Sequence, residues 1–229
     1  MQFRRSSADM PTPAQLEAQN NYAAILQEIN MRVDAINHCT LGLSGLLPPF
    51  VVEFSYLEIR MICELVALGC LVAHGDLRQS SALRKQWSAD EIMKQLENLH
   101  PQFYPYAIVQ TKTATGYHIH RLDPQPLPKV DFLRLYGRLG DVLHRGSLKN
   151  LMKPNIPHQT QFPVVMAKLQ KLVDMLSNHA IVMRSGKEMF LAMLKNADDN
   201  FRPQVAIAES PEPIDYNSPE FMKYPLVQS

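Results

Sequence analysis

The chain has 229 residues, 46% of them hydrophobic and 20% charged, and this composition excludes a disordered, collagen-like or disulfide-scaffold protein. Its 23 lysines and arginines nearly balance its 22 aspartates and glutamates, so the formal charge of +1 does not indicate a protein that coats polyanions. The three cysteines show no paired spacing, and the first ten residues contain no apolar run of a signal peptide. We therefore expect a reducing, cytoplasmic location.

The first predicted element is a long amphipathic helix. After an amino-terminal arm at 1–11, apolar residues recur at helical spacing from Leu16 to Ile36. Thr12 is suited to cap this helix, and Pro13 to occupy its first position, where the missing N–H costs nothing. Two glycines after residue 40 end the helix.

A second helix is predicted at about 50–74, opened by prolines 48 and 49. It is apolar on nearly all sides, which predicts a central position. Its most apolar run, 61–73, is too short to cross a membrane, which requires about 20 apolar residues. Two shorter helices follow around Trp87, and Ser88 with a glutamate at 91 has the spacing of a capping box.

Strands are predicted in two places. Two β-branched runs around a glycine turn indicate a hairpin near 107–121, and a proline-rich linker leads from it into a third strong helix at about 130–152. A further helix is expected from about Phe162 to Asn178. Three short runs at 180–208, separated by turn residues, then predict an antiparallel meander.

The predicted fold is α+β and predominantly α. A helical bundle at 12–179 includes the β-hairpin, and the C-terminal three-stranded antiparallel meander packs on the bundle. Residues 209–229 are predicted to form a proline-rich extended tail.

Several chemical signatures are missing from the sequence. It contains no glycine-rich nucleotide-binding loop, and no CxxC, HExxH or GxSxG motif, so we expect no nucleotide cofactor. His118 and His120 alternate along a predicted strand and share a face, a spacing that can chelate a transition metal. Because no further ligand is evident, we favour exposed histidines without a metal.

The second helix carries two further pairs. Cys63 and Cys70 share a face, but on so apolar a helix they are interpreted as small core residues. Arg60 and Glu64 are four residues apart, where an ion pair or a bond to a neighbouring helix would satisfy both. Such a pair can be a structural link or part of a site, and the sequence leaves both alternatives open.

The segment with the clearest functional signal lies in the third strong helix. Gly137 and Gly140 share one stripe of that helix with His144, so we expect the histidine to face a closely packed neighbour or a second copy of the chain. Asp141 is three residues from both Arg138 and His144, where one carboxylate can orient both side chains. The candidate catalytic residues are therefore Arg138, Asp141 and His144.

Arg138 and His144, with five residues between them, resemble the motif of the HEPN superfamily, in which an arginine precedes a histidine in a late helix of a bundle. The segment YGRLGDVLHRG is also similar to the last bundle helix of bacterial HEPN-like proteins. The resemblance covers this helix and the order of the helices before it, but not the meander. It departs from the nucleolytic members at Leu139, where many of them have a polar residue.

For active members, the resemblance implies a homodimer that brings two motifs together in a cleft and cleaves RNA without a metal. It further implies that His144 transfers protons around the ribose 2′-OH and that Arg138 holds the phosphate. Arg32 and His38 in the first helix have the same spacing. The later pair is preferred for its position, its glycine stripe and Asp141.

Two functions of different classes follow. The first is an HEPN-like, metal-independent ribonuclease with a defence or toxin role, and the alternative is a non-catalytic dimeric helical adaptor or sensor. A basic cleft that contains Arg138 and His144 favours the ribonuclease, whereas burial of His144 within one subunit favours the adaptor. A homodimer is expected in both cases, because the glycine stripe and the apolar second helix offer more apolar surface than one bundle hides.

Overall fold

The structure of the chain is a computed structural model. It describes residues 2–3, 12–74, 88–113, 116–143, 161–183, 185–209 and 213–214. The described helices are α1 (Pro13–Thr40), α2 (Pro48–Ala73), α4 (Ala89–Leu99), α5 (Lys129–Leu143) and α7 (Phe162–Ser177), with a 3-10 turn η3 (Ala197–Asp199). The described strands are β1 (Gln2–Phe3), β2 (Tyr106–Thr113), β3 (Gly116–Arg121), β4 (Asn178–Val182), β5 (Glu188–Asn196) and β6 (Arg202–Glu209). The predicted α+β class, with its hairpin and its C-terminal meander, is confirmed.

The starts of the helices show how local sequence sets the elements. At α1, the Thr12 hydroxyl accepts a hydrogen bond from the backbone N–H of Gln15 at 3.2 Å, and the Gln15 side chain accepts one from the N–H of Thr12 at 2.8 Å. Thr12 therefore caps the helix as predicted. At α4, Ser88 is the N-cap residue, but its hydroxyl binds the carboxylate of Asp90. The capping box predicted there with Glu91 is therefore not formed.

The strands form one sheet in the order β1-β3-β2-β4-β5-β6, and every pair of neighbours is antiparallel. The predicted hairpin is β2–β3, and the predicted meander is β4–β5–β6. A short ladder between β2 and β4, with Tyr106 opposite Ala180, joins the two into a single sheet. Within the predicted arm, β1 pairs with β3 and places Gln2 opposite His118.

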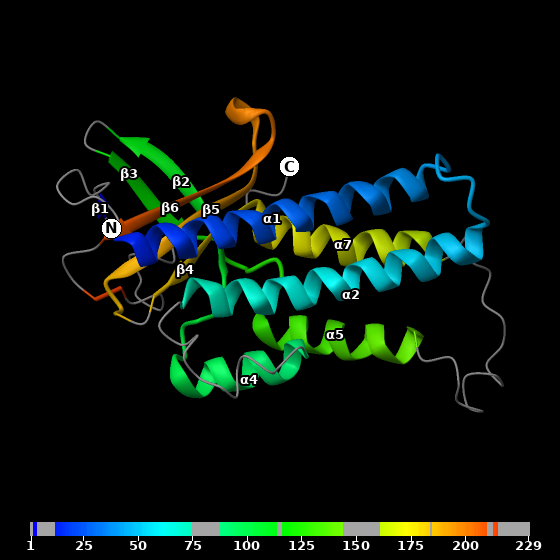
Figure 1. The fold of residues 1–229 in the computed structure, drawn as a ribbon, viewed down its shortest axis with the longest axis horizontal. Helices are drawn as coiled ribbons and strands as arrows, with labels where there is room; N and C mark the ends of the chain where they lie inside the picture. Colours follow the sequence, from blue (N-terminus) through cyan, green and yellow to red (C-terminus); the bar gives the residue numbers. More distant parts are fainter. Residues whose placement is uncertain are drawn as a thin grey trace.

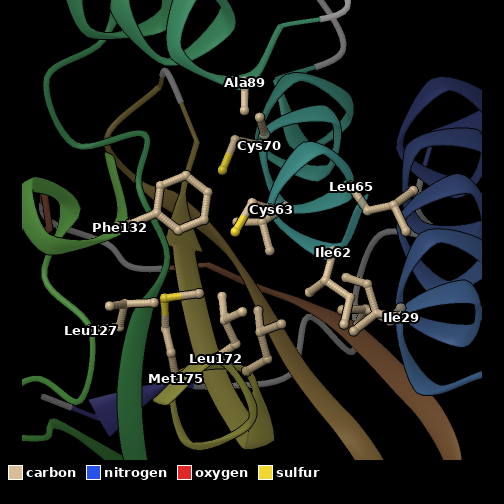
Figure 2. Packing of buried hydrophobic residues seen from close by; sticks show 14 of the residues in the cluster. Ile29, Ile62, Cys63, Leu65, Cys70, Ala89, Leu127, Phe132, Leu172 and Met175 are labelled. Carbon is tan, nitrogen blue, oxygen red and sulfur yellow. The ribbon is translucent and has the colours of Figure 1, made fainter. Parts of the chain in front are cut away.

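The helices are arranged in layers, with α1 and α7 nearest the sheet and α2, α4 and α5 farther from it (Figure 1). Helices α1 and α7 contact strands of the sheet, whereas α2 packs against α1, α4, α5 and α7. Figure 2 shows Cys63 and Cys70 of α2 directed toward Phe132 of α5, with Leu172 and Met175 of α7 nearby. All five side chains are at most 1% exposed, so the central position predicted for the second helix is confirmed on this side of α2.

Some predicted features lie outside the described residues. The third strong helix is described only to Leu143, and the first of the two short helices before Ser88 is not covered. The tail is described only at 213–214, where Ile214 is buried against the sheet. None of the described helices combines the length and the hydropathy that a membrane span requires.

Candidate functional site

A groove of about 560 Å³ lies between α5 and α7. Four cationic side chains and one carboxylate line it, which gives a formal charge of +3 in a chain whose total is +1. The charged residues are Arg134, Arg138, Lys168, Lys171 and Asp131, and the apolar ones are Leu127, Leu135, Pro163, Val164 and Ala167. Such a concentration of positive charge over an apolar floor suits an anionic ligand with an apolar part.

Helical periodicity explains how the groove is built. The α5 residues that line it lie at 131, 134, 135 and 138, and the α7 residues at 164, 167, 168 and 171, with Pro163 beside them in the first turn of α7. Each set follows the spacing i, i+3, i+4, i+7, so each helix presents one complete face to the groove. Residue spacing identified Arg138 but not Lys168 and Lys171, because these two lysines share the groove with Arg138 only where α5 and α7 both pack against α2.

The four cationic side chains of the groove differ in whether they already form an ion pair or a hydrogen bond. Arg134 forms an ion pair with Asp131 at 2.5 Å, and Lys168 donates a hydrogen bond to the Tyr56 hydroxyl at 3.2 Å. Arg138 and Lys171 are exposed and make no hydrogen bond or ion pair with another described residue. These two side chains therefore have their donors available for a bound anion.

The structure brings only part of the predicted constellation together. Arg138 lines the groove, whereas Asp141 is exposed, does not line it and makes no ion pair with Arg138. The predicted orientation of Arg138 by Asp141 is therefore not observed. His144 lies outside the described residues.

The two glycines of the stripe differ in their surroundings. Gly140 is buried, and a Cβ atom there would come within 2.9 Å of a guanidinium nitrogen of Arg60, so this glycine does allow close packing of α5 on α2. Gly137 is exposed, with no atom within 4 Å of the position of a Cβ. Within one copy of the chain, Gly137 therefore faces no packed neighbour among the described residues, and its contact with a second copy stays a prediction.

Arg60 and Glu64 form the link that their spacing allowed. Arg60 pairs with Glu64 at 3.3 Å, donates to the Tyr136 hydroxyl at 2.8 Å and lies over the Tyr136 ring, 4.3 Å from its centre. The Tyr136 hydroxyl donates in turn to Glu64 at 3.0 Å. Burial and this hydrogen bond raise the pKa of Tyr136. Because all three groups satisfy one another, the cluster is interpreted as the polar link between α2 and α5.

In the other arginine–histidine pair of the same spacing, Arg32 and His38, the arginine already binds two carboxylates. Arg32 donates to Glu28 at 2.6 Å and to Glu58 at 2.7 Å, on the face that α1 shares with α2. With two carboxylates already bound, Arg32 is a poor candidate for holding a phosphate, and Arg138 remains the better one.

The remaining candidates are structural in character. The three cysteines are buried and unpaired, and burial raises the pKa of both Cys63 and Cys70 well above that of an ordinary thiol, which disfavours a reactive thiolate. The rings of His118 and His120 stack with their centres 6.1 Å apart. Within the described part of the chain, no group of three potential ligands gathers around a possible metal.

We predict that protein purified without an affinity tag contains substoichiometric zinc. Two histidines on one strand supply two ligands, whereas a structural zinc site requires four. Elemental analysis by mass spectrometry measures the content directly. One zinc per chain, lost on replacing His118 by alanine, would contradict the prediction.

Comparison of the chain with family models, curated proteins and solved structures finds no match. The resemblance to the HEPN superfamily therefore stays a prediction from the sequence motif.

Proposed function

We propose that the protein binds single-stranded RNA in the groove between α5 and α7 and cleaves it without a metal. The observation that carries the proposal is the charge of this groove: Arg138 and Lys171 lie in it unpaired with described residues, beside two further cations and an apolar floor. Phosphates account for most of the affinity in non-specific recognition of nucleic acids, and arginine can bind a phosphate through two parallel hydrogen bonds.

In the proposed reaction, Arg138 holds the scissile phosphate and stabilises the charge that develops on it. His144 transfers the proton at the ribose 2′-OH, as the motif implies, and Asp141 is the candidate to orient it. The 2′ oxygen attacks the adjacent phosphorus as its proton passes to His144, the bond from phosphorus to the 5′ oxygen breaks, and the leaving 5′ oxygen takes a proton from water, so a cyclic phosphate and a 5′-hydroxyl result. This chemistry requires RNA, because DNA lacks the attacking hydroxyl.

The binding step has its own test. We expect the logarithm of the association constant for a fluorescent single-stranded RNA to fall linearly with the logarithm of salt concentration, because bound cations are released. Arg138→Ala and Lys171→Ala should each weaken binding and reduce the slope by roughly 0.7, the value for one phosphate contact on a single strand. Fluorescence anisotropy at several salt concentrations provides the measurement.

Lys94→Ala is the matched control, because Lys94 is an exposed lysine on α4, outside the groove. The proposal predicts that this variant keeps the slope of the parent. Equal effects of Lys94→Ala and Lys171→Ala would show that binding depends on total charge and not on the groove.

A second candidate function, a non-catalytic dimeric adaptor or sensor, is favoured by a different observation. Helix α2 exposes large apolar side chains along its outer side, including Phe50, Leu57 and Leu68. An apolar face of this kind is typical of an interaction surface. The adaptor predicts no RNA cleavage by the parent protein, so the cleavage assay separates the two candidates.

A further inference from the structure

Helix α2 has two apolar faces, and only one of them is covered. The inner face, with Ile59, Ile62 and Cys63, is fully buried in the core. On the outer side, Leu47, Phe50, Leu57 and Leu68 are 64%, 54%, 45% and 40% exposed. A helix that is hydrophobic all round is normally buried all round, so the outer face of α2 lacks a partner within the described chain.

The outer residues follow a regular heptad pattern. Alternating steps of three and four residues give one seam, which consists of Leu47, Phe50, Phe54, Leu57, Met61, Glu64 and Leu68. Six of the seven are apolar, and the seam extends over 22 residues, about 32 Å along the helix axis from Leu47 to Leu68. A repeat of this period is the pattern by which one α-helix packs along another, so the missing partner of the seam is a helix.

The neighbouring helices flank the seam and leave its apolar residues open, while Glu64 within it is bound by Arg60 and by Tyr136 of α5. On one side, Glu58 is held by Arg32 of α1, and on the other, Arg60 is held by Tyr136 of α5. In Figure 1, α2 accordingly lies between α1 and α5. A shallow groove of about 550 Å³ continues from Phe54 onto α1, where it is lined by residues that include Met31.

We propose that the seam of α2 is a homodimer interface, in which α2 packs antiparallel against α2 of a second copy. This inference does not depend on RNA cleavage. A second copy supplies a preformed helix of the same period and length, so no ordering of a disordered partner is required. Pairing of one surface with itself is also what a two-fold dimer demands.

The polar residue in the seam determines the direction of the pair. A parallel, in-register pair would place Glu64 opposite the partner's Glu64, and like charges in an apolar seam repel. An antiparallel pair separates the two carboxylates toward opposite ends of the contact. It also opposes the dipoles of the two helices.

The apolar and charged pairs across the contact then favour one antiparallel register. When Phe54 is set opposite the partner's Leu57, Phe50 meets the partner's Met61, and Glu53 lies close to the partner's Arg60 along the axis. Shifting the partner by one heptad keeps the seam in contact but sets Glu58 beside the partner's Glu58. This register is less favourable, because the two like charges repel.

The selected register also uses the connection between α1 and α2. Its exposed leucines, Leu43 and Leu46, continue the apolar surface beyond the first turn of α2. In the antiparallel pair, this end lies near the partner's Leu68. The proposed interface therefore covers apolar side chains of the connection as well as those of the seam.

The dimer leaves the groove between α5 and α7 complete in each copy. Arg138 lies on the side of α5 that faces α7, whereas Tyr136 lies on the side that meets α2. The two grooves would therefore remain separate, and the dimer can be tested without reference to RNA.

The test is sedimentation equilibrium of the full chain at micromolar concentrations. The parent should be a dimer, and Leu57→Glu should weaken the dimer by about 100-fold or more, because it places an unpaired charge in an apolar contact. Leu16→Glu is the matched control, with a leucine that is 42% exposed on α1, outside the seam. Circular dichroism shows whether each variant is folded, and Leu57→Lys serves if Leu57→Glu is not.

A monomeric parent at tens of micromolar would overturn the proposal, as would a Leu57→Glu variant that dimerises like the parent. Direction and register are tested by cross-linking, since the native cysteines are buried. The double variant Phe50→Cys/Met61→Cys should form a covalent dimer on mild oxidation, and neither single variant should. Cross-linking of Phe50→Cys alone would overturn the antiparallel arrangement.

Discussion

Replacing Arg138 or His144 by alanine should reduce the cleavage of single-stranded RNA in EDTA by about 10²–10⁴-fold, the loss expected on removing a general acid or base or a principal charge stabiliser. Arg138 is exposed and makes no bond to another described residue, so Arg138→Ala should leave the fold unchanged. The readout is the initial rate on a labelled RNA, together with the single-turnover rate at saturating protein.

Two comparisons sharpen this prediction. Arg138→Lys keeps the charge but loses the two parallel donors, so it should bind RNA nearly as well as the parent while cleaving it more slowly. Lys94→Ala should cleave at the rate of the parent. Activity within a few-fold of the parent in both Arg138→Ala and His144→Ala would reject the assignment.

The adaptor predicts a different pattern. The parent would then show no cleavage, and His144→Ala would lower the free energy of unfolding by about 1–3 kcal/mol, through loss of a buried contact and its hydrogen bond. Thermal or urea unfolding of the same variants measures this effect. One set of proteins therefore separates the two functions.

The elements of the fold were predictable where their signals are local. Thr12 and Pro13 predicted the start of α1, and the prolines at 48–49 predicted that of α2, because caps and prolines act within one turn. The capping box at Ser88 failed for an equally local reason, since the hydroxyl bonds the nearer Asp90. Spacing alone does not decide between two acceptors in reach.

What the sequence did not predict depends on contacts between distant segments. Hairpin and meander were both expected, but their union requires Tyr106 to pair with Ala180, and hydrophobic periodicity carries no information on which strands pair. The site shows the same limit. Residue spacing identified Arg138, whereas Lys171 lines the same groove only because α5 and α7 both pack against α2.

Helix α2 shows a third kind of limit. Its apolar character on nearly all sides correctly predicted a central position, but burial by neighbours within the chain accounts for one face only. Phe50 and Leu57 remain exposed on the other face. Hydropathy shows how many apolar residues a helix carries. It does not show whether they are buried by the same chain or by another molecule.

The stability of the protein should fall as the pH is lowered from about 6.5 to 4, and His179 should be one principal cause. His179 is fully buried; its Nε2 lies 2.6 Å from the Tyr22 hydroxyl, and its Nδ1 lies 2.9 Å from the carbonyl oxygen of Leu176. A carbonyl only accepts, so Nδ1 carries the proton and Nε2 accepts from Tyr22, which is the arrangement of a neutral ring. Burial lowers the pKa of His179 to about 4, against a smaller opposing effect of the bond to Leu176.

Stability falls as the pH is lowered because His179 has a lower pKa in the folded chain than in the unfolded chain. Between pH 6.5 and 4 the unfolded chain binds a proton at this histidine and the folded chain does not, so the free energy of unfolding decreases as the pH falls. A difference of this size in pKa corresponds to a loss of about 3 kcal/mol, complete near pH 4 and absent above pH 7. Urea unfolding at pH 7, 5.5 and 4.5 measures the loss.

Two variants isolate the contribution of His179. His179→Gln keeps an acceptor for the Tyr22 hydroxyl but does not titrate, so its stability should change by about 3 kcal/mol less than that of the parent over the same range. Tyr22→Phe keeps the titrating ring but removes its donor, so it should be less stable at pH 7 and still depend on pH. A parent and a His179→Gln variant with parallel pH profiles would show that this histidine does not control acid stability. Because Tyr22 belongs to α1 and His179 to β4, protonation of the pair should first weaken the contact between the helical layer and the sheet.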